Sequence, residues 1–462
     1  MTLEEALRII ESQGKAIAEL IAQNTMLRAE IDKLRGHLGQ NSSNSDRPPS
    51  SDGFKKRQKN SKKSKRKRGA QPGHKGTNRP KAAIEEVSNH IEFHLEGACD
   101  CGCSDVVGKK MQPSHQTWEL PEMGPIITQY YVESGRCKNC RKRRTASLPS
   151  EVPKGALGPR TQSIIAMLTG QYRLSRRNAE KLLKELCGLT ISLGTVSNSE
   201  KIVSDALRNP CMEILKQVRA SDIVNTDETG HLRFAKRLFT WGLSTPKLTV
   251  IKAGLRRNRK ALMAILGRDF KGIVISDNYN AYSHLPPGRH QLCWAHFYRK
   301  FKTLSEKPDL LGLVGKTLLK LSQKVFLTRK RLKQNKLCYD DYHAELLSLK
   351  KKFEYLLGRY HLVPEIRPLA HVYLLQDQKV WLFAQDPSVE PTNNLAERDL
   401  RQPVIWRKTS FGTWSYRGDR FFERMLTFVG TLRKQGKDVL VSLEKTVKAK
   451  HSKLLPSPVF SN

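Results

Sequence analysis

The apolar positions of the first forty residues repeat every seven residues. One set of positions recurs with that period, and a second set follows each member by three. These positions are Leu3, Ile10, Ile17, Asn24, Ile31 and Leu38, and Ala6, Gln13, Leu20, Leu27 and Leu34. Isoleucine in one seam and leucine in the other favours a parallel two-stranded coiled coil, in which a single buried Asn fixes the register. Residues 1–40 are therefore expected to pair with a second copy; a lone amphipathic helix packed on its own domain is the alternative.

Farther along, the spacing of apolar residues predicts a helical domain over residues 153–215. Three segments, "TQSIIAMLTGQY", "SRRNAEKLLKELCG" and "SLGTVSNSEKIVSDALR", have the period of amphipathic helices. The tight joint "GLTISLGTV" between the last two resembles a helix-turn-helix, whose last helix would enter a DNA groove. A plain three-helix bundle fits the same pattern.

The pattern then changes to short β-rich runs, which predict an α/β core. The runs and the helix expected among them are "DIVNTD", "RLFTWGLST", "KLTVIKAG", the helix "RRNRKALMAILG", "KGIVISD" and "RHQLCWAH". This core covers residues 216–296 and 385–436, and the long amphipathic segments of 297–384 are interpreted as a helical insertion. A last helical region is expected to start near Asn394, to break at Pro403 and to resume near Asp419. Residues 437–462 are assigned to a C-terminal tail.

Charge narrows the class of partner. The 462-residue chain has 82 Lys and Arg against 44 Asp and Glu, a formal net charge of +38. Such an excess is self-repelling without a polyanion, and nucleic acid is the usual one. A ribosomal or merely solvated basic protein is the alternative, which the length and the varied apolar pattern disfavour. No apolar run reaches the ~18 residues that a membrane span needs, and the start is unlike a signal peptide, so a soluble protein of a reducing compartment is expected.

A run of basic residues lies in a linker predicted for residues 41–85. The stretch "QNSSNSDRPPSSDG" cannot bury a core, and ten Lys and Arg without one acid follow it between Lys55 and Arg68. Such a run can neutralise DNA phosphates without reading sequence; a solvated disordered tail is the alternative. The residues expected to contact DNA here include Lys55, Lys56, Arg57, Lys62, Lys63, Lys65, Arg66, Lys67 and Arg68.

Five cysteines bracket strand-like pieces within residues 86–152. They are Cys99, Cys101, Cys103, Cys137 and Cys140. The spacing "CKNC" lets two thiolates hold one Zn²⁺, whereas "CDCGC" offers only CxC or CxxxC. Four of the five are expected to close a structural zinc site, which would make this segment a small zinc-binding module; buried or free thiols are the alternative.

Three acids suggest a second kind of metal site. Asp227 and Asp277 each close a β-rich run, and ligands bind beyond the carboxyl ends of strands in open α/β sheets. Glu397 follows on a helix, and three carboxylates are the oxygen ligands that Mg²⁺ or Mn²⁺ prefers. The alternative for Glu397 is structural: with Asn394 three residues earlier, it can be the return arm of a capping box. That alternative does not account for Arg401, which shares the same helix face and can hold a phosphate.

Other polar and aromatic residues lie near these acids in the sequence. Cys293 and His296 have ligand-like spacing, but without a second pair nearby, packing behind the site is favoured over a metal role. Four aromatic residues, for which burial is the default and stacking on unpaired bases the alternative, are Tyr279, Trp294, Trp406 and Trp414. Phosphate contacts are instead expected from Arg299, Arg398 and Arg401.

Several of these stretches together resemble a known family. "TDETG", "SDNYNAY", "CWAHFYRKF" and "NNLAERDLR", with "NSSNSDRPPSSD", "QPGHKG" and the cysteine module in the same order, are similar to the signature blocks of the DDE transposases of the insertion-sequence family numbered sixty-six. The resemblance runs from about residue 20 to residue 436. The first cysteine cluster departs from the family pattern, because it lacks the usual CxxC, and the last eighteen residues do not match the family's end.

The resemblance implies a fold and an activity. It implies a ribonuclease-H-like catalytic core in which Asp227, Asp277 and Glu397 bind two Mg²⁺ or Mn²⁺ ions. It also implies a bacterial cytoplasmic, nucleoid-associated protein that cleaves the ends of its own mobile element and joins the 3′-hydroxyls to target DNA. A homo-oligomer, at least a dimer, and small companion proteins are further expectations. A ribonuclease-H-like nuclease or junction resolvase without strand transfer, and a non-catalytic DNA-binding regulator, are the rival functions.

Overall fold

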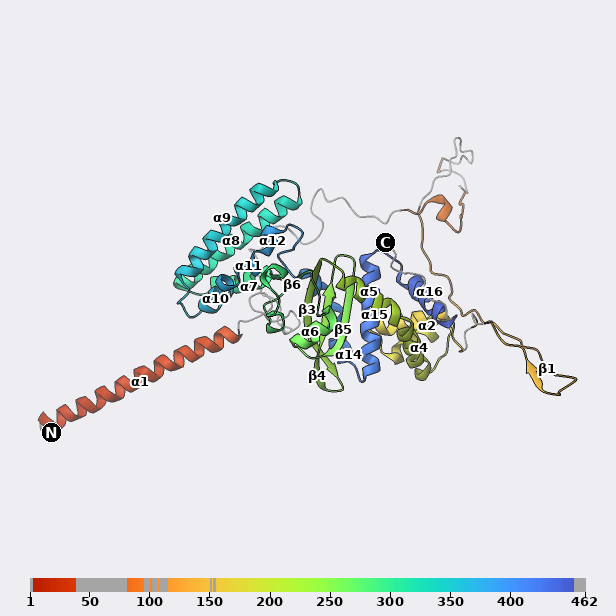
Figure 1. Ribbon diagram of the computed structural model, residues 1–462, viewed down its shortest axis with the longest axis horizontal. Helices are drawn as coiled ribbons and strands as arrows, with labels where there is room; N and C mark the ends of the chain where they lie inside the picture. Colours follow the sequence, from red (N-terminus) through yellow and green to blue (C-terminus); the bar gives the residue numbers. More distant parts are fainter. Residues whose placement is uncertain are drawn as a thin grey trace.

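The first described element is a single long helix. The computed structural model describes residues 3–38, 81–94, 100–101, 103, 107, 115–149, 152 and 155–452 (Figure 1). Helix α1 spans Leu3–Leu38 without a break. Both predicted seams contain side chains that are exposed along it, among them Ile17, Leu20 and Leu27. A single chain therefore leaves this apolar stripe uncovered.

The cysteine-containing segment has little regular structure among its described residues. It contains the short helix η2 (Ile84–Glu86) and the antiparallel pair β1 (Ser134–Arg136) and β2 (Arg143–Thr145). The "CKNC" stretch forms the turn between β1 and β2, where the Cys137 N–H donates to the Lys142 carbonyl over 3.0 Å. Cys99 lies outside the described residues.

A five-stranded sheet forms the centre of the molecule (Figure 1). Its strands are β3 (Ile223–Arg233), β4 (Lys236–Ser244), β5 (Thr249–Leu255), β6 (Ile273–Ser276) and β7 (His290–Leu292), in the spatial order β5-β4-β3-β6-β7. The first three strands are antiparallel neighbours joined by short turns, whereas β6 and β7 run parallel to β3. Parallel neighbours need a crossover, and α6 (Arg259–Leu266) supplies it between β5 and β6. The structure is therefore a mixed α/β fold, as the sequence predicts.

Helices from both ends of the core pack together beside this sheet. They are α2 (Pro159–Ala166), continued by a π-helical turn (Met167–Gln171), α3 (Arg176–Cys187), α4 (Leu193–Ala206), α5 (Arg208–Arg219), α15 (Tyr416–Lys434) and α16 (Val439–His451). Helices α5 and α15 contact β5, and the others pack on these two or on one another. Fully buried Trp241 and Val250 from the sheet share a core with Val203 of α4 and Phe428 of α15. The sequence predicts three helices before the sheet; α2, α3 and α4 match those segments, and α5 adds a fourth.

The predicted insertion consists of helices in the structure. They are α7 (Trp294–Ser305), α8 (Asp309–Lys333), α9 (Tyr339–Arg359), α10 (Arg367–Leu375), α11 (Asp377–Val380) and α12 (Leu382–Gln385). Trp294 is fully buried at their centre, with ring centroids of Phe353 and Trp381 at 5.5 Å and 4.8 Å. Its indole N–H donates to the Val380 carbonyl over 2.7 Å. The burial expected for Trp294 is thereby confirmed.

The C-terminal helices differ from the prediction in two places. Helix α13 (Asn394–Asp399) is followed directly by α14 (Arg401–Ser410), which contains Pro403 in its first turn, where no intrahelical N–H is needed. The break comes instead at residues 411–415. Residues 439–451, assigned to a tail by sequence, form α16, whose Leu443 and Val447 are fully buried. No helix in the described part of the chain is long and apolar enough to cross a membrane.

Candidate active site

The register of two parallel strands sets Asp227 and Asp277 side by side. Ile223 pairs with Ile273 and Asn225 with Ile275, so the same offset brings position 227 level with position 277. Level residues on neighbouring strands point to the same face of a sheet, about 5 Å apart. Asp277 follows the end of β6, as the sequence predicts, but Asp227 lies within β3, which continues to Arg233. That prediction was wrong because β4 continues to pair with β3 beyond the point where β6 stops.

Glu397 approaches these residues from α13, which is anchored to β3. The side-chain amide of Asn393 donates to the Thr226 carbonyl over 2.8 Å, and Asn225 donates to the Asn393 side chain over 3.2 Å. The capping residue of α13 is Asn393, with no side-chain cap, and the third helical residue is Ala396. The proposed capping box between Asn394 and Glu397 is therefore out of register by one residue, and that interpretation is wrong.

All three acids line one cavity of about 2150 Å³. The predicted phosphate-binding residues Arg299, Arg398 and Arg401 line it as well. Arg299 reaches Glu397 across the cavity, with 3.4 Å between its guanidinium and a carboxylate oxygen. Residues that are 170 positions apart in the chain thus share one cavity.

Like charges crowd around Asp227. Burial, followed by repulsion from Glu228, Asp277 and Glu397, raises the pKa of Asp227 well above its ordinary value, and one hydrogen bond from the Glu228 backbone N–H opposes this. Burial and the charge of Asp277 likewise raise the pKa of Glu228. A bound cation would relieve this repulsion, and oxygen-only donors are those that Mg²⁺ and Mn²⁺ prefer. The donor set therefore fits a divalent ion.

Glu228 and Arg257 belong to the site, although the predicted site residues do not include them. Arg257 lies 2.6 Å from Glu228 and 3.9 Å from Asp277, and its guanidinium stacks 3.6 Å from the ring centre of Tyr279. The phenol of Tyr282 donates to Glu228 over 2.7 Å. The signal in the sequence is the adjacent pair of acids in "TDETG": alternation along a strand points the second acid to the opposite face, where it needs a partner.

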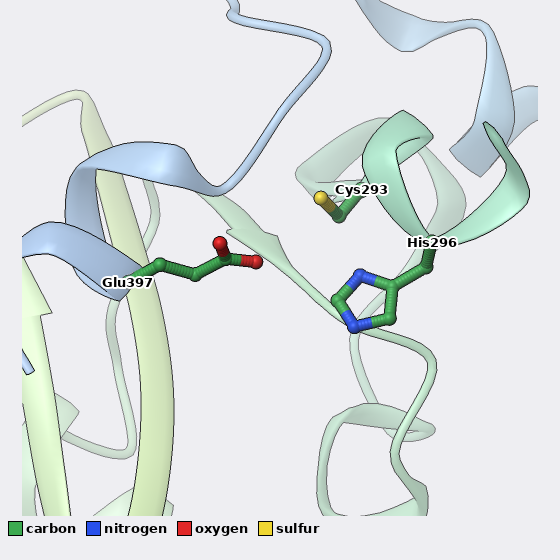
Figure 2. A group of neighbouring side chains, drawn as sticks. All are labelled: Cys293, His296 and Glu397. Atoms are coloured by element: carbon green, nitrogen blue, oxygen red, sulfur yellow. The ribbon is translucent and has the colours of Figure 1, made fainter. Parts of the chain in front are cut away.

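Cys293 and His296 lie beside Glu397, as Figure 2 shows. One ligand-type atom from each of these three residues lies within 4.8 Å of the others. The sulfur of Cys293 accepts the Asn393 N–H over 3.2 Å, and burial raises the pKa of its thiol to about 12. The guanidinium of Arg299 approaches His296 to 3.3 Å as well as Glu397. A buried neutral thiol and a cation already in place favour the packing role that the sequence indicates for Cys293.

The other predicted site residues that the structure describes do not line this cavity. The basic run, Lys55 to Arg68, lies outside the described residues. Cys101, Cys103, Cys137 and Cys140 form neither a disulfide nor a metal-sized group among the described residues. Trp406 is half-buried against Phe422, whereas Trp414 is 79% exposed. The default of burial is therefore wrong for Trp414.

Comparisons with known proteins identify two family models and one protein that are similar to parts of this chain. The model of the Transposase IS66 family matches residues 154–420, and that of a family of unknown function, DUF6444, matches residues 3–80. An uncharacterized protein, y4qI, from Sinorhizobium fredii (strain NBRC 101917 / NGR234) is 27% identical over 197 residues. That similarity covers 38% of this chain and 36% of the relative, so the chain spans about a third of the curated relative that it matches.

Proposed function

The chain belongs to the Transposase IS66 family, and on that premise we propose that it cuts the ends of its own mobile element and joins them to target DNA. The observation that carries this proposal is the cavity in which Asp227, Asp277 and Glu397 meet. Asp227 lies on β3 and Asp277 directly follows the adjacent strand β6, and the third acid is fixed by the anchoring of α13 to β3. The family makes the chain a DNA-processing enzyme; the reaction and the residues that perform it are our proposal.

The three acids are proposed to hold two Mg²⁺ or Mn²⁺ ions. When bound, such ions activate an attacking oxygen and stabilise the leaving oxygen of a phosphodiester. Asp227 and Asp277 stand level and would share the ions, while Glu397 would complete the set from the opposite side. The sheet order, with three antiparallel strands followed by two parallel ones, supports a ribonuclease-H-like core.

Two arginines would position the DNA, and a third would hold Glu397. Arg398 and Arg401 line the cavity next to Glu397, and a guanidinium can hold a phosphate through two parallel hydrogen bonds. Arg299 is placed differently, because it already reaches Glu397. We propose that Arg299 holds the Glu397 carboxylate toward the two aspartates until an ion is bound.

A structural zinc site is proposed for the cysteine segment. The Cys140 and Asn139 backbone N–H groups face the Cys137 sulfur and, with the Cys140 side chain, lower the pKa of that thiol, which favours the thiolate that binds Zn²⁺. Two of Cys99, Cys101 and Cys103 would complete the site. Metal analysis of native protein should find about one zinc per chain, lost on replacing Cys137 and Cys140 by Ser; protein without zinc contradicts the proposal.

A homodimer is proposed through α1, whose exposed apolar stripe needs a partner. Light scattering should show that deletion of residues 1–38 halves the mass, and an unchanged mass rules the coiled coil out as the dimer contact. We further propose that the basic run adds sequence-independent DNA affinity, that the helices α2 to α4 take part in recognition of element ends, and that small companion proteins act with the chain.

The function is tested by cutting and joining assays on DNA that carries the sequences flanking the gene. Glu397→Gln removes the charge and keeps the shape, so we expect a folded protein that binds DNA but neither cuts nor joins. The matched control is Glu390→Gln, because Glu390 lines the same cavity but is paired with Lys333 and Arg329. It should cut at close to the wild-type rate.

The outcomes separate the rival functions. Cutting without joining of pre-cut ends would indicate a nuclease or resolvase. Sequence-specific binding without either reaction in Mn²⁺ would indicate a regulator. Full activity of Glu397→Gln would show that the third ligand is wrongly assigned.

A further inference from the structure

Four large aromatic side chains are exposed together at one end of the sheet. Phe234 lies at the turn between β3 and β4, and Phe411, Trp414 and Tyr416 lie around the break between α14 and α15. They are 71%, 81%, 79% and 63% exposed, respectively. The rings of Phe234 and Trp414 have centroids 5.8 Å apart. We refer to these four residues as the aromatic platform.

The backbone at the platform is held in conformations that disfavour large side chains. Phe234 and Phe411 have φ values of 44° and 54°, in the left-handed region. Phe234 and Ala235 are the two central residues of a two-residue hairpin, where Asn and Gly are the usual choice. Bulky residues at positive φ are rare. Both rings are exposed, so burial of apolar surface does not offset this strain. Their exposed aromatic character therefore needs an explanation outside the fold.

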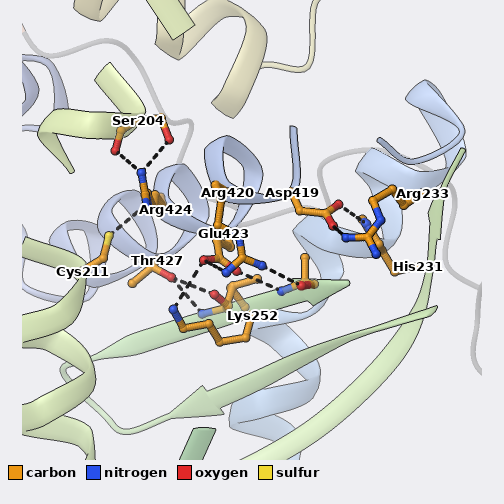
Figure 3. A network of polar contacts seen from close by, with 12 residues as sticks. Ser204, Cys211, His231, Arg233, Lys252, Asp419, Arg420, Glu423, Arg424 and Thr427 are labelled. Atoms are coloured by element: carbon orange, nitrogen blue, oxygen red, sulfur yellow. Dashed lines mark hydrogen bonds and ion pairs between the residues drawn. The ribbon is translucent and has the colours of Figure 1, made fainter. Parts of the chain in front are cut away.

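The two segments that carry the platform are fixed to each other. The Phe234 N–H donates to the Thr413 carbonyl and the Thr413 N–H to the Leu232 carbonyl, both over 2.9 Å. Gly412 permits this approach, because a Cβ there would lie 2.2 Å from the Leu232 carbonyl oxygen. Beneath them, fully buried Asp419 binds Arg233 and joins α15 to β3, as Figure 3 shows. The platform is thus preformed.

Basic residues predominate around the platform, although the charge of Arg233 is balanced by Asp419. Residues 229–241 and 400–418 contain no Asp or Glu. Their basic residues are Arg233, Lys236, Arg237, Arg401, Arg407, Lys408 and Arg417. The guanidinium of Arg420 covers Tyr416, 4.6 Å from its ring centre, which leaves Phe234, Phe411 and Trp414 as open surfaces. Basic residues interleaved with exposed aromatic rings are the combination that binds single-stranded nucleic acid.

The cavity extends toward the platform. Between the acids and the aromatic rings it is lined by Thr229 and Gly230 of β3 and by Ile405 and Lys408 of α14. Phe234 comes seven positions after Asp227, just beyond the end of β3, which is at most about 23 Å at the rise of a strand. Phe411 comes fourteen positions after Glu397, through α13 and α14, which is at most about 21 Å at the rise of a helix. Both paths place the platform at most about 23 Å from the acids, a span of several nucleotides of an unpaired strand.

We propose that the aromatic platform stacks on unpaired bases of the DNA whose backbone lies in the cavity. The faces of the bases are accessible only in unpaired DNA, whereas proteins contact the bases of a duplex at their edges. The proposal rests on the proposed function for the identity of the DNA, and the stacking itself can be tested without cutting.

The test is binding of full-length Asp227→Asn protein to oligo(dT) and to duplex DNA, followed by tryptophan fluorescence and anisotropy. Trp118 and Trp414 are the most exposed tryptophans among the described residues, so Trp118→Phe is the matched control. Stacked bases should quench fluorescence in the Trp118→Phe background and not in Trp414→Phe. Trp414→Ala should weaken oligo(dT) binding roughly tenfold, with duplex affinity changed less than about twofold. On a duplex end, the effect should appear with single-stranded flanks of about ten nucleotides and not of about two.

Several results would overturn the proposal. These are equal losses on duplex and oligo(dT), quenching that persists in Trp414→Phe, or a smaller particle mass for Trp414→Ala, which would make the platform a contact between copies of the chain. Because no variant need cut DNA, stacking without cutting would refute the proposed function alone, and cutting without stacking would refute the platform alone.

Discussion

The acids between α15 and the sheet have different surroundings from those around the cavity. Asp419 is bound by Arg233, His231 and the Thr413 hydroxyl, and Figure 3 shows the neighbouring pairing of Glu423 with cationic side chains. Burial acts to raise the pKa of Asp419, but these hydrogen bonds and the charge of Arg233 outweigh it, so the pKa lies below its ordinary value.

Around the cavity, the effects that raise the pKa of an acid prevail over those that lower it. Asp227 is buried beside three other carboxylates, and its pKa is raised well above the ordinary value. The chain has nearly twice as many Lys and Arg as acids, so cations are not scarce. Arg257 and Arg299 pair with Glu228 and Glu397, whereas the charges that raise the pKa of Asp227 are those of Glu228, Asp277 and Glu397. We infer that the first group of acids stabilises the fold and that the second is kept for an external cation.

The largest effect is expected among the acids around the cavity. Asp227→Asn should lower the cutting rate by ~10³-fold or more, because a two-ion site supplies several kcal/mol to phosphoryl transfer. It should also raise the free energy of unfolding by about 1 kcal/mol in chelator, since it removes a buried repelled charge. Cutting rates and urea unfolding at neutral pH test both statements. A variant that is inactive because it is less stable than the wild type would contradict this assignment.

The next-largest effect is expected among the acids between α15 and the sheet. Asp419→Asn should lower the free energy of unfolding by about 3 kcal/mol, because it leaves His231 and Arg233 without their buried counter-charge. At a temperature where the variant is still folded, cutting per folded molecule should be close to that of the wild type. Urea unfolding measures the first and single-turnover assays the second. Loss of cutting in fully folded Asp419→Asn would show that the two groups are not separate.

A smaller loss of stability, on the order of 1–2 kcal/mol, is expected for Asp399→Asn. Asp399 accepts hydrogen bonds from Ser244 and Thr249 over 2.6 Å and 2.8 Å and pairs with Lys434 at 2.6 Å. It is two residues from Glu397, yet it faces away from the cavity. Thermal melts and cutting assays should therefore show a less stable but active protein, and an inactive, stable one would place the site on the wrong face of α13.

The smallest effects are changes with pH, and they have opposite signs for the two groups. The folded pKa of Asp419 is lowered, so its stabilising contribution is present above the unfolded pKa of about 3.8 and is lost as the pH falls through the folded pKa. The folded pKa of Asp227 is raised, so its cost is present at neutral pH and disappears as the pH falls toward 3.8. In chelator, both variants should approach wild-type stability in acid, Asp227→Asn from above and Asp419→Asn from below. Parallel pH profiles would contradict this.

The sequence predicted well what depends on local pattern. The β-rich runs form strands, except that the second half of "RHQLCWAH" begins α7. The spacing of fifty residues between Asp227 and Asp277 matches the register of β3 and β6. The helix face shared by Glu397 and Arg401 lines the cavity. The capping box failed because one residue of helix phase decides it, and helix starts cannot be read to that accuracy.

Contacts between distant segments could not be predicted. Cys293 and His296 lie about a hundred positions before Glu397, and only the packing of α7 beside α13 brings them together. Trp294 and Trp414 look alike in the sequence, yet one is the centre of the helical core and the other is exposed. Which of them can stack on DNA follows from tertiary structure alone.

The central claim is that the cavity acids hold divalent ions, and Mn²⁺ binding measured by electron paramagnetic resonance tests it most directly. The wild type and Glu390→Gln should bind about two Mn²⁺ ions per chain with equal affinity. Glu397→Gln should lose one of these ions, or bind it at least about tenfold more weakly, while its unfolding curve in chelator stays unchanged. Equal Mn²⁺ binding by Glu397→Gln and the wild type would contradict the claim.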